Sequence, residues 1–268
     1  MIPNILSIAG SDPSGGAGIQ ADIKAISANG GYAMAAITAL TAQNTQGVSG
    51  VHMVPPAVVA DQIRTIREDI RIDAVKIGML GTAPVIDAVA EALAGLAAPV
   101  VLDPVMVAKS GDRLLDAAAV DGLRALLPRA AVITPNLPEA ADLLGVPEAR
   151  TPEAMAEQAR ALLALGPGAV LLKGGHLPGE DCRDLLLGPD GAFWMPGPRH
   201  PTTRTHGTGC TLSAALASLL GHGLALPEAA QRAKAYVAGA IAAAEALDVG
   251  RGHGPTHHFH RFPKGYAP

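Results

Sequence analysis

The segment HGTGCT at residues 206–211 combines two glycines, small hydroxyl residues and a cysteine, and an apolar helical stretch follows at 212–220. The first backbone N–H groups of a helix have no intrahelical acceptor and lie at the positive end of the helix dipole. Such a turn binds anions, and a phosphate or a phosphoryl group in transfer suits it best. The alternative is a tight turn before a helix, with no ligand.

Cys210 falls in the first turn of this helix. There the amide N–H groups and the dipole stabilise the negative form of a thiol, so we expect Cys210 to be shifted toward thiolate. The neighbouring Thr205, His206 and Thr211 favour a phosphate site over a plain turn. An anion cradle that contains a base predicts phosphoryl transfer rather than binding alone.

A second glycine-rich turn, GSDPSGGAG at residues 10–18, lies between a predicted strand and a predicted helix. It lacks the Lys-Ser/Thr pair of a Walker loop, and no acidic residue closes the next strand as in a dinucleotide-binding fingerprint. Its glycines, which begin with Gly10, would let a flat substrate approach the backbone closely. The alternative is a tight loop in which Asp12 caps a turn.

Further polar residues carry specific chemistry. The amide group of Gln43 can donate to and accept from the ring nitrogen and amine of a heterocycle. Alternatively, Gln43 is a solvated residue at the end of a strand. Asn136 and Glu139 are spaced to hold water around Mg²⁺ or to form a helix capping box, and the two roles are compatible. Lys173 would place a cation beside a nucleotide phosphate, and Asp103 would help order the solvent shell of the metal.

Three other features of the sequence point less clearly to a chemical role. The polar segment KSGD at residues 109–112 is a candidate lid. The histidine-rich stretch GHGPTHHFH at 252–260 has no nearby carboxylate or cysteine, so a structural role is favoured over a metal site. No glycine turn at a helix start adjoins Cys182, and we expect it to be inert.

Apolar runs of strand length alternate with stretches of helical spacing along most of the chain. Strands are predicted at 4–9, 35–42, 74–80, 100–105, 131–134 and 169–173, and two short strands form a hairpin within 184–197 around the turn PDG. Helices are predicted at 18–28, 56–70, 84–96, 117–127, 151–165 and 236–246. Thr151 is the expected N-cap of the helix at 151–165, with Pro152 at its first position.

This alternation predicts an α/β fold with a mainly parallel central sheet and helices on both faces. No linker, repeat or low-complexity stretch divides the chain, so a single domain over residues 1–268 is expected. Ligands of open sheets bind beyond the carboxyl ends of the strands. Residues at or just after the predicted strand ends should therefore gather at one edge of the sheet, namely Asn44, Gly78, Met79, Asp103, Asn136 and Lys173.

The composition excludes several function classes. A net charge of −4 and an aromatic content of 3% argue against a nucleic-acid-binding protein. The apolar run at residues 5–9 has no basic segment before it, so no secretory signal is expected, and the alanine-rich stretch at 236–246 is too short for a membrane span. With two cysteines and no CxxC spacing, neither disulfides nor a thiolate zinc site is expected, and the cytoplasm fits best.

Together these motifs resemble those of the hydroxymethylpyrimidine/phosphomethylpyrimidine kinases, the thiamine-synthesis members of the ribokinase-like superfamily. The resemblance covers nearly the whole chain: AGSDPSGGAGIQAD at 9–22, TALTAQNT at 38–45, KIGML at 76–80, DPVMVAKSGD at 103–112, TPNLPEA at 134–140, LLKGGH at 171–176, HGTGCTLSAAL at 206–216 and GPTHHFH at 254–260. It implies a ribokinase-like fold and phosphorylation, with ATP and Mg²⁺, of 4-amino-5-hydroxymethyl-2-methylpyrimidine to its monophosphate and then its diphosphate. The superfamily's sugar kinases carry GxGD where this chain has a cysteine, which points to the vitamin-kinase branch.

The resemblance also implies roles for individual residues and a homodimer. Cys210 corresponds to the catalytic base, and Gly207, Thr208 and Gly209 form the anion hole with it. The pyrimidine site is expected from Gln43, Gly10, Asp22, Met79 and Val105. The ATP site is expected from Lys173, Asn136, Glu139, Thr205 and Thr211, and Asp103 and Glu139 are expected to meet Mg²⁺ through water.

Other functions stay open at this point. A pyridoxal or pyridoxine kinase would use the same catalytic residues. A side-by-side assay of the two substrates separates these functions, and Gln43 is the first residue to substitute. A thiol hydrolase with Cys210 as nucleophile and His206 as base would need no ATP. A catalytically silent nucleotide sensor would bind ATP without turnover.

Overall fold

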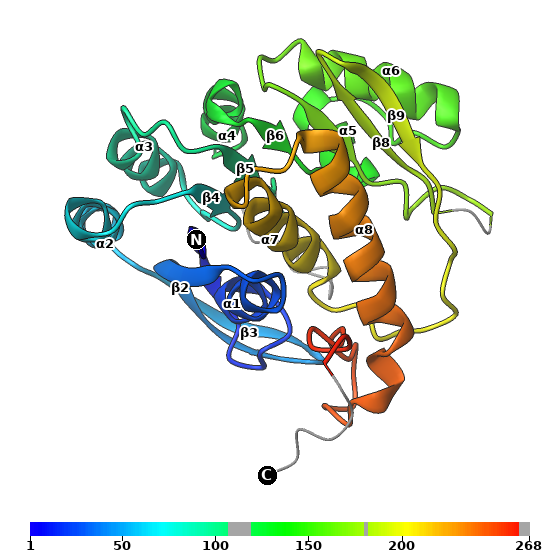
Figure 1. The fold of residues 1–268 in the computed structure, drawn as a ribbon, viewed down its shortest axis with the longest axis horizontal. Coiled ribbons are helices and arrows are strands. Elements are labelled where there is room, and N and C mark those ends of the chain that lie inside the picture. The colour runs from blue at the N-terminus through cyan, green and yellow to red at the C-terminus, as the bar shows by residue number, and fades with distance from the viewer. Residues whose placement is uncertain (107–118, 180–181, 263–268) are drawn as a thin grey trace.

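The computed structural model describes residues 1–106, 119–179 and 182–262 (Figure 1). Within these residues one continuous nine-stranded sheet has the order β3-β2-β1-β4-β5-β6-β7-β8-β9. The strands are β1 (Asn4–Ser11), β2 (Tyr32–Asn44), β3 (Gly47–Met53), β4 (Ala74–Ile77), β5 (Val100–Leu102), β6 (Val132–Ile133), β7 (Val170–Leu172), β8 (Asp184–Gly188) and β9 (Gly191–Met195).

The central part of the sheet is parallel, as expected. Strands β2, β1, β4, β5, β6 and β7 run in one direction, and β3, β8 and β9 add antiparallel pairs at the two edges. The chain passes from β1 to β2 on one side and later to β4 on the other side of β1. The strand order therefore reverses beside β1, which is where open α/β sheets bind their ligands.

Helices cover both faces of the sheet (Figure 1). Along β1 the side chains alternate: Ile5 packs in the cluster with α1, α7 and α8, whereas Leu6 and Ile8 pack with α2 to α6. The expectation of helices on both faces is confirmed. The helices are α1 (Gly18–Ala28), α2 (Pro56–Asp69), α3 (Ala83–Ala92), α4 (Val120–Leu126), α5 (Leu137–Leu144), α6 (Pro152–Leu163), α7 (Thr208–Gly221) and α8 (Leu226–Ala242), with short 3₁₀ turns at Leu127–Arg129 and Ala244–Ala246.

Several boundaries differ from the expected ones. Strand β3 was not expected from the sequence, because none of its residues is buried and no alternation marks it. Strand β5 ends at Leu102 instead of residue 105, because the backbone turns there and the N–H of Val105 donates to the carbonyl of Asp103 at 2.8 Å. Helix α8 begins at Leu226, well before the alanine-rich stretch that predicted it.

Local signals for helix starts are confirmed. Asn136 and Glu139 form a reciprocal capping box at α5, with both hydrogen bonds at 2.8 Å. The Thr151 hydroxyl accepts the N–H of Ala154 at 3.2 Å at the start of α6. The candidate lid at 109–112 and the first residues of the helix expected at 117–127 lie outside the described residues. In the described part of the chain, no helix is long and apolar enough to cross a membrane.

Candidate active site

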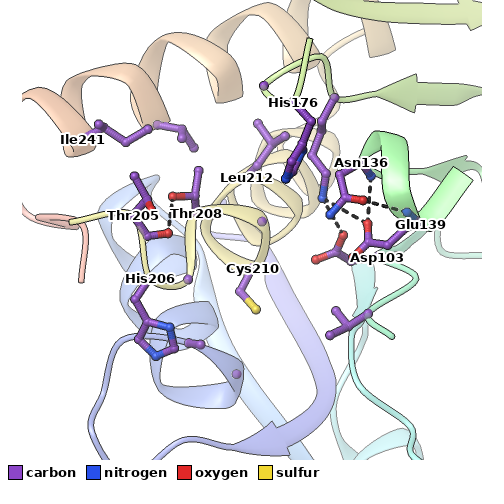
Figure 2. Close-up of a pocket in the computed structure, with 18 of the residues that line it drawn as sticks. Asp103, Asn136, Glu139, His176, Thr205, His206, Thr208, Cys210, Leu212 and Ile241 are labelled. Atoms are coloured by element: carbon purple, nitrogen blue, oxygen red, sulfur yellow. Dashed lines mark hydrogen bonds and ion pairs between the residues drawn. The ribbon is translucent and has the colours of Figure 1, made fainter. Parts of the chain in front are cut away.

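A cavity of about 1360 Å³ lies at the carboxyl ends of the parallel strands. Met79 after β4, Asp103 after β5, Asn136 after β6 and Lys173 after β7 all line it, so the predicted gathering at one edge is confirmed for these residues. Asn44, the last residue of β2, and Gly78, which follows β4, do not line the cavity. Figure 2 shows the start of α7 facing the cluster formed by Asp103, Asn136 and Glu139.

The turn that opens α7 has the geometry of an anion cradle. Gly207 is its N-cap, with φ 75° and ψ 11°, and a Cβ at this position would collide with the carbonyl oxygen of Gly16. In the described chain, the N–H groups of Gly207, Gly209 and Cys210 have no acceptor, while that of Thr208 has only a long bond of 3.3 Å. Unpaired N–H groups at a helix start favour a bound anion.

Cys210 lines the cavity beside these N–H groups and is half-buried (Figure 2). Burial raises the pKa of its thiol to about 11, a shift that the charge of Lys76 opposes. The nearby carboxylates of Asp22 and Asp103 raise it further, and the N–H of Gly18 lowers it. The expected shift toward thiolate is therefore wrong at neutral pH, because desolvation outweighs the first-turn amides and the dipole.

Beneath the cavity, Lys76 of β4 forms a buried ion pair. Its ammonium nitrogen lies 2.8 Å from Oδ2 of Asp22, and both side chains are completely buried. The same carboxylate oxygen accepts the Ser7 hydroxyl at 2.6 Å. Burial alone would lower the pKa of Lys76, but the charge of Asp22 above all holds it well above its usual range, so Lys76 stays charged.

Lys76 also lines the cavity, and reasoning from the sequence did not single it out. Gly78 leaves room for its head group, because a Cβ there would lie only 2.6 Å from the Lys76 nitrogen. The available signal was a lysine inside the apolar run at 74–80, since a charged residue in a buried strand requires a partner.

Asp103 is the central residue of the cavity wall that faces the start of α7. One carboxylate oxygen accepts the Thr134 hydroxyl at 2.9 Å and the Lys173 ammonium at 3.1 Å, and the other accepts the Ser213 hydroxyl at 3.3 Å. Burial raises the pKa of Asp103, but the charges of Lys173 and Lys76 and the hydrogen bonds from Lys173 and Thr134 outweigh burial, so the net shift is downward. The carboxylate is ionised and holds Lys173 toward the cavity.

Glu139 shares this wall. Its Oε2 atom lies 3.8 Å from the Lys173 nitrogen and accepts the N–H of Asn136. Burial raises the pKa of Glu139 to about 7, and the charge of Asp103 adds to this, although Lys173 opposes it. Glu139 therefore changes its charge near neutral pH.

This shift predicts a pH-dependent stability. The folded state binds the Glu139 proton more tightly than the unfolded chain, so the unfolding free energy should fall as pH rises from about 4.5 to about 7. In Glu139→Gln, which keeps an oxygen for the capping box, this decrease should be smaller. Urea unfolding at pH 5 and pH 7.5 measures it, with Glu157→Gln on the exposed face of α6 as control. Parallel pH dependences in wild type and Glu139→Gln would show the prediction wrong.

A buried pair of side chains joins the two glycine-rich turns. The Nε2 atom of His206 lies 2.8 Å from Oδ2 of Asp12, which also accepts the N–H of Ala17 at 2.8 Å. The other oxygen of Asp12 accepts the N–H of Ser14 at 2.9 Å, so Asp12 caps its turn as one alternative predicted. Burial raises the pKa of Asp12, but the bond from His206 and the turn bonds lower it overall.

The remaining predicted residues fall into two groups. Gln43, Gly10, Val105 and Thr205 line the cavity together with Met79. The Thr41 hydroxyl lies 2.8 Å from the carbonyl oxygen of Ser11 and 3.2 Å from the side-chain oxygen of Gln43. Asp22 and Thr211 are completely buried and do not line the cavity. Asp22 supports Lys76 from behind the wall, and Thr211 supports the cradle from inside α7.

An apolar part of the cavity lies between α7 and α8. Leu212, Val237, Ala238 and Ile241 line it, and Figure 2 shows Leu212 and Ile241 on the side away from Cys210. These residues were missed, because small apolar residues on a helix look the same in the sequence whether they face a core or a ligand. The surface suits a flat aromatic group. Cys182, expected to be inert, also lines the cavity.

Comparison with known proteins agrees with this geometry. Residues 12–257 match the model of the phosphomethylpyrimidine kinase family. The chain is 54% identical over 259 residues to the hydroxymethylpyrimidine/phosphomethylpyrimidine kinase of Escherichia coli K12, covering 96% of this chain and 97% of that relative.

Two solved structures are similar over most of their length. A phosphomethylpyrimidine kinase from Clostridium difficile 630 has a TM-score of 0.79 and 42% identity, covering 89% of this chain and 99% of its own. A Bacillus subtilis pyridoxal kinase in complex with ADP has a TM-score of 0.89 and 37% identity, covering 96% and 98%. The expected ribokinase-like α/β fold is confirmed. The chain belongs to the hydroxymethylpyrimidine/phosphomethylpyrimidine kinase family of thiamine biosynthesis.

Proposed function

We propose that this protein transfers the γ-phosphoryl group of ATP to 4-amino-5-hydroxymethyl-2-methylpyrimidine, and a second phosphoryl group to the resulting monophosphate. One observation supports this most: Cys210 and the unpaired N–H groups of Gly207 and Gly209 share one cavity with Lys173 and Asp103. An acceptor alcohol between these walls would meet a proton acceptor, an anion cradle and a cation together.

The two substrates would occupy different parts of the cavity. The apolar surface of α7 and α8 suits the adenine ring, and Lys173 would meet the charge of the phosphates. The pyrimidine would lie near Gly10, Gln43 and Met79, which line the cavity and include an amide side chain. The acceptor and the γ-phosphate would then meet at the cradle.

The residues present fit a Mg²⁺ ion held mainly through water. Asp103 and Glu139 line the cavity, while the described residues contain no group of three side chains suited to bind a metal directly. Mg²⁺ keeps several waters and needs few protein ligands, so we infer that Asp103 and Glu139 orient its water molecules. When bound, the ion neutralises charge on the phosphates.

Transfer follows an in-line displacement. The hydroxymethyl oxygen bonds to the γ-phosphorus as its proton passes to the sulfur of Cys210, and the bond from that phosphorus to the ADP oxygen breaks. The N–H groups of Gly207, Gly209 and Cys210 stabilise charge on the equatorial oxygens. Because Cys210 is a thiol at neutral pH, the reacting form must first release a proton to solvent, and the charge of Lys76 favours that thiolate.

A mass measurement tests the proposed reaction. The protein is incubated with ATP, Mg²⁺ and the hydroxymethylpyrimidine, and both the mono- and diphosphorylated products are expected. Parallel incubations with pyridoxal and without ATP separate the alternatives. Faster phosphorylation of pyridoxal, or a covalent cysteine adduct formed without ATP, would contradict the proposal.

Gln43 provides a specificity prediction. Gln43→Leu removes both amide contacts to the pyrimidine, so kcat/KM for the hydroxymethylpyrimidine should fall about tenfold or more, the effect of one or two lost hydrogen bonds. KM for ATP should stay unchanged in steady-state assays. Gln46→Leu, at an exposed neighbouring position, is the matched control. Unchanged kcat/KM in Gln43→Leu would remove this residue from the pyrimidine site.

We also propose that the protein acts in the cytoplasm and forms a homodimer. The large apolar side chains of Leu40 and Val51 are exposed on the β2–β3 pair at one edge of the sheet. Exposed apolar groups on such an edge favour contact with another chain.

A further inference from the structure

The histidine-rich segment at residues 254–260 packs against the outer side of the anion cradle. Its carbonyl at Gly254 accepts the N–H of His206 at 3.1 Å, and His206 and Pro255 form an isolated parallel bridge. Thr256 and His258 are buried. Figure 1 shows this segment, in red, beside α1 and the end of α8. The proposed reaction uses none of its side chains.

His258 connects this segment to the cradle through Thr211. Its Nε2 atom lies 3.0 Å from the Thr211 hydroxyl oxygen, and that hydroxyl donates to the carbonyl of Gly207 at 2.8 Å. A hydroxyl has only one hydrogen to donate, so Nε2 of His258 must carry the hydrogen of the other bond. The Tyr236 hydroxyl donates to the carbonyl of His258 at 2.7 Å and holds its backbone.

The carbonyl group that accepts the last of these hydrogen bonds belongs to the cradle itself. The carbonyl of Gly207 accepts both the N–H and the hydroxyl of Thr211, each at 2.8 Å. A carbonyl and the following N–H lie in one peptide plane. Fixing the Gly207 carbonyl therefore fixes the direction of the Thr208 N–H, which opens α7 at the cavity.

The charge state of His258 suits this role. Burial lowers the pKa of His258 to about 4, and the charges of Lys24, His257 and His260 add to this. At neutral pH the ring is uncharged, with one nitrogen that donates and one that does not. The ring therefore keeps one protonation state around neutral pH, and Nε2 donates to Thr211 without a change of charge.

We propose that His258 is a positioning residue: through Thr211 it orients the Gly207–Thr208 peptide of the anion cradle. Its effect on turnover rests on the proposed kinase function, whereas its effect on the cradle backbone does not. Removing the donor should leave substrate binding intact and shift the start of α7, which misaligns the N–H groups of Gly209 and Cys210 that follow this peptide and hold the transferring group. A loss of about tenfold in kcat is expected, with KM for ATP within about twofold, as for other supporting hydrogen bonds at reactive sites.

Three variants test this. His258→Met removes the donor and keeps bulk, His258→Gln keeps an N–H that reaches Thr211, and Thr211→Val removes the hydroxyl from the other side. His257→Met, next to the bond but not part of it, is the control. Steady-state kinetics are measured beside amide hydrogen exchange of the peptide at 205–212, which reports on the cradle whether or not the protein is a kinase.

The expected pattern is specific. His258→Met and Thr211→Val should lower kcat and speed exchange of the hydrogen-bonded amides of Thr208 and Thr211 several-fold, while His258→Gln and His257→Met behave as wild type. If wild type fails to phosphorylate the pyrimidine, the proposed function is wrong, and the exchange data still decide the role of His258. Equal losses in His258→Gln and His258→Met, or unchanged exchange in both His258→Met and Thr211→Val, would overturn the inference.

Discussion

Replacing Cys210 with alanine is expected to lower kcat for the first phosphorylation by about 10²–10⁴, the usual contribution of a positioned general base. The acceptor in that step is an alcohol, which must lose its proton as the new bond forms. Single-turnover assays with saturating ATP and hydroxymethylpyrimidine measure the loss. Cys182→Ala is the matched control, because Cys182 lines the same cavity away from the cradle and should keep wild-type turnover.

The second phosphorylation provides an internal comparison. Its acceptor is already a phosphate and has little need of a base, so Cys210→Ala should impair this step less than the first. Loss of a cradle component would instead impair both steps, because both transfer the same group. Equal losses in the two reactions of Cys210→Ala would contradict the role of proton acceptor.

The raised pKa of Cys210 also predicts how kcat/KM of the first phosphorylation depends on pH. With a thiol pKa of about 11, the thiolate fraction rises as pH increases through the neutral and alkaline range. The kcat/KM of the first step reports groups of the free enzyme, so it should rise about tenfold per pH unit up to about pH 9. The rise should disappear in Cys210→Ala. A flat profile in the wild type would show that another group takes the proton.

Lys76→Met is expected to have the largest effect on stability. It leaves the completely buried carboxylate of Asp22 without its partner, and breaking a buried pair typically costs ~3–5 kcal/mol of unfolding free energy. Urea unfolding followed by circular dichroism measures the loss. Arg64→Met, which breaks the exposed pair with Asp61, should change stability little.

A second variant separates the charge effect from lost packing. Adding Asp22→Asn to Lys76→Met removes the isolated charge, so the double variant should be more stable than Lys76→Met alone. The Ser7 hydroxyl can still donate to the amide oxygen of the new asparagine. If the double variant loses as much stability as the two single variants added together, Lys76 and Asp22 do not act as a pair.

The sequence was sufficient to predict the fold class and most elements. Periodicity predicted the parallel strands, and residues such as Asn136 and Thr151 predicted where helices begin, because caps depend on neighbouring residues alone. Strand ends were less accurate. The predicted strand extends to residue 105, yet the strand ends at Leu102, because the backbone turns at Asp103, which lines the cavity.

Parts of the site that depend on distant contacts were not predictable. The thiolate expectation for Cys210 considered only its own helix, whereas its pKa is set by burial and by charges from α1, β4 and the residues after β5. The pairing of Asp12 with His206 joins residues almost two hundred positions apart. His258 and Thr211 are 47 positions apart, and the sequence placed them in unrelated motifs.

The structure also bears on the alternative of a thiol hydrolase. That reaction requires a base directed at the sulfur of Cys210. The Nε2 atom of His206 is instead held by the carboxylate of Asp12, and its ring packs against Gly16. His206 therefore joins the two turns, and the geometry favours phosphoryl transfer.

A crystal structure with a non-hydrolysable ATP analogue and the hydroxymethylpyrimidine tests the central claim most directly. We predict that the sulfur of Cys210 lies within hydrogen-bond reach of the hydroxymethyl oxygen, with the γ-phosphate at the N–H groups that open α7. Ligands bound away from this helix start, with the sulfur contacting neither of them, would contradict the account.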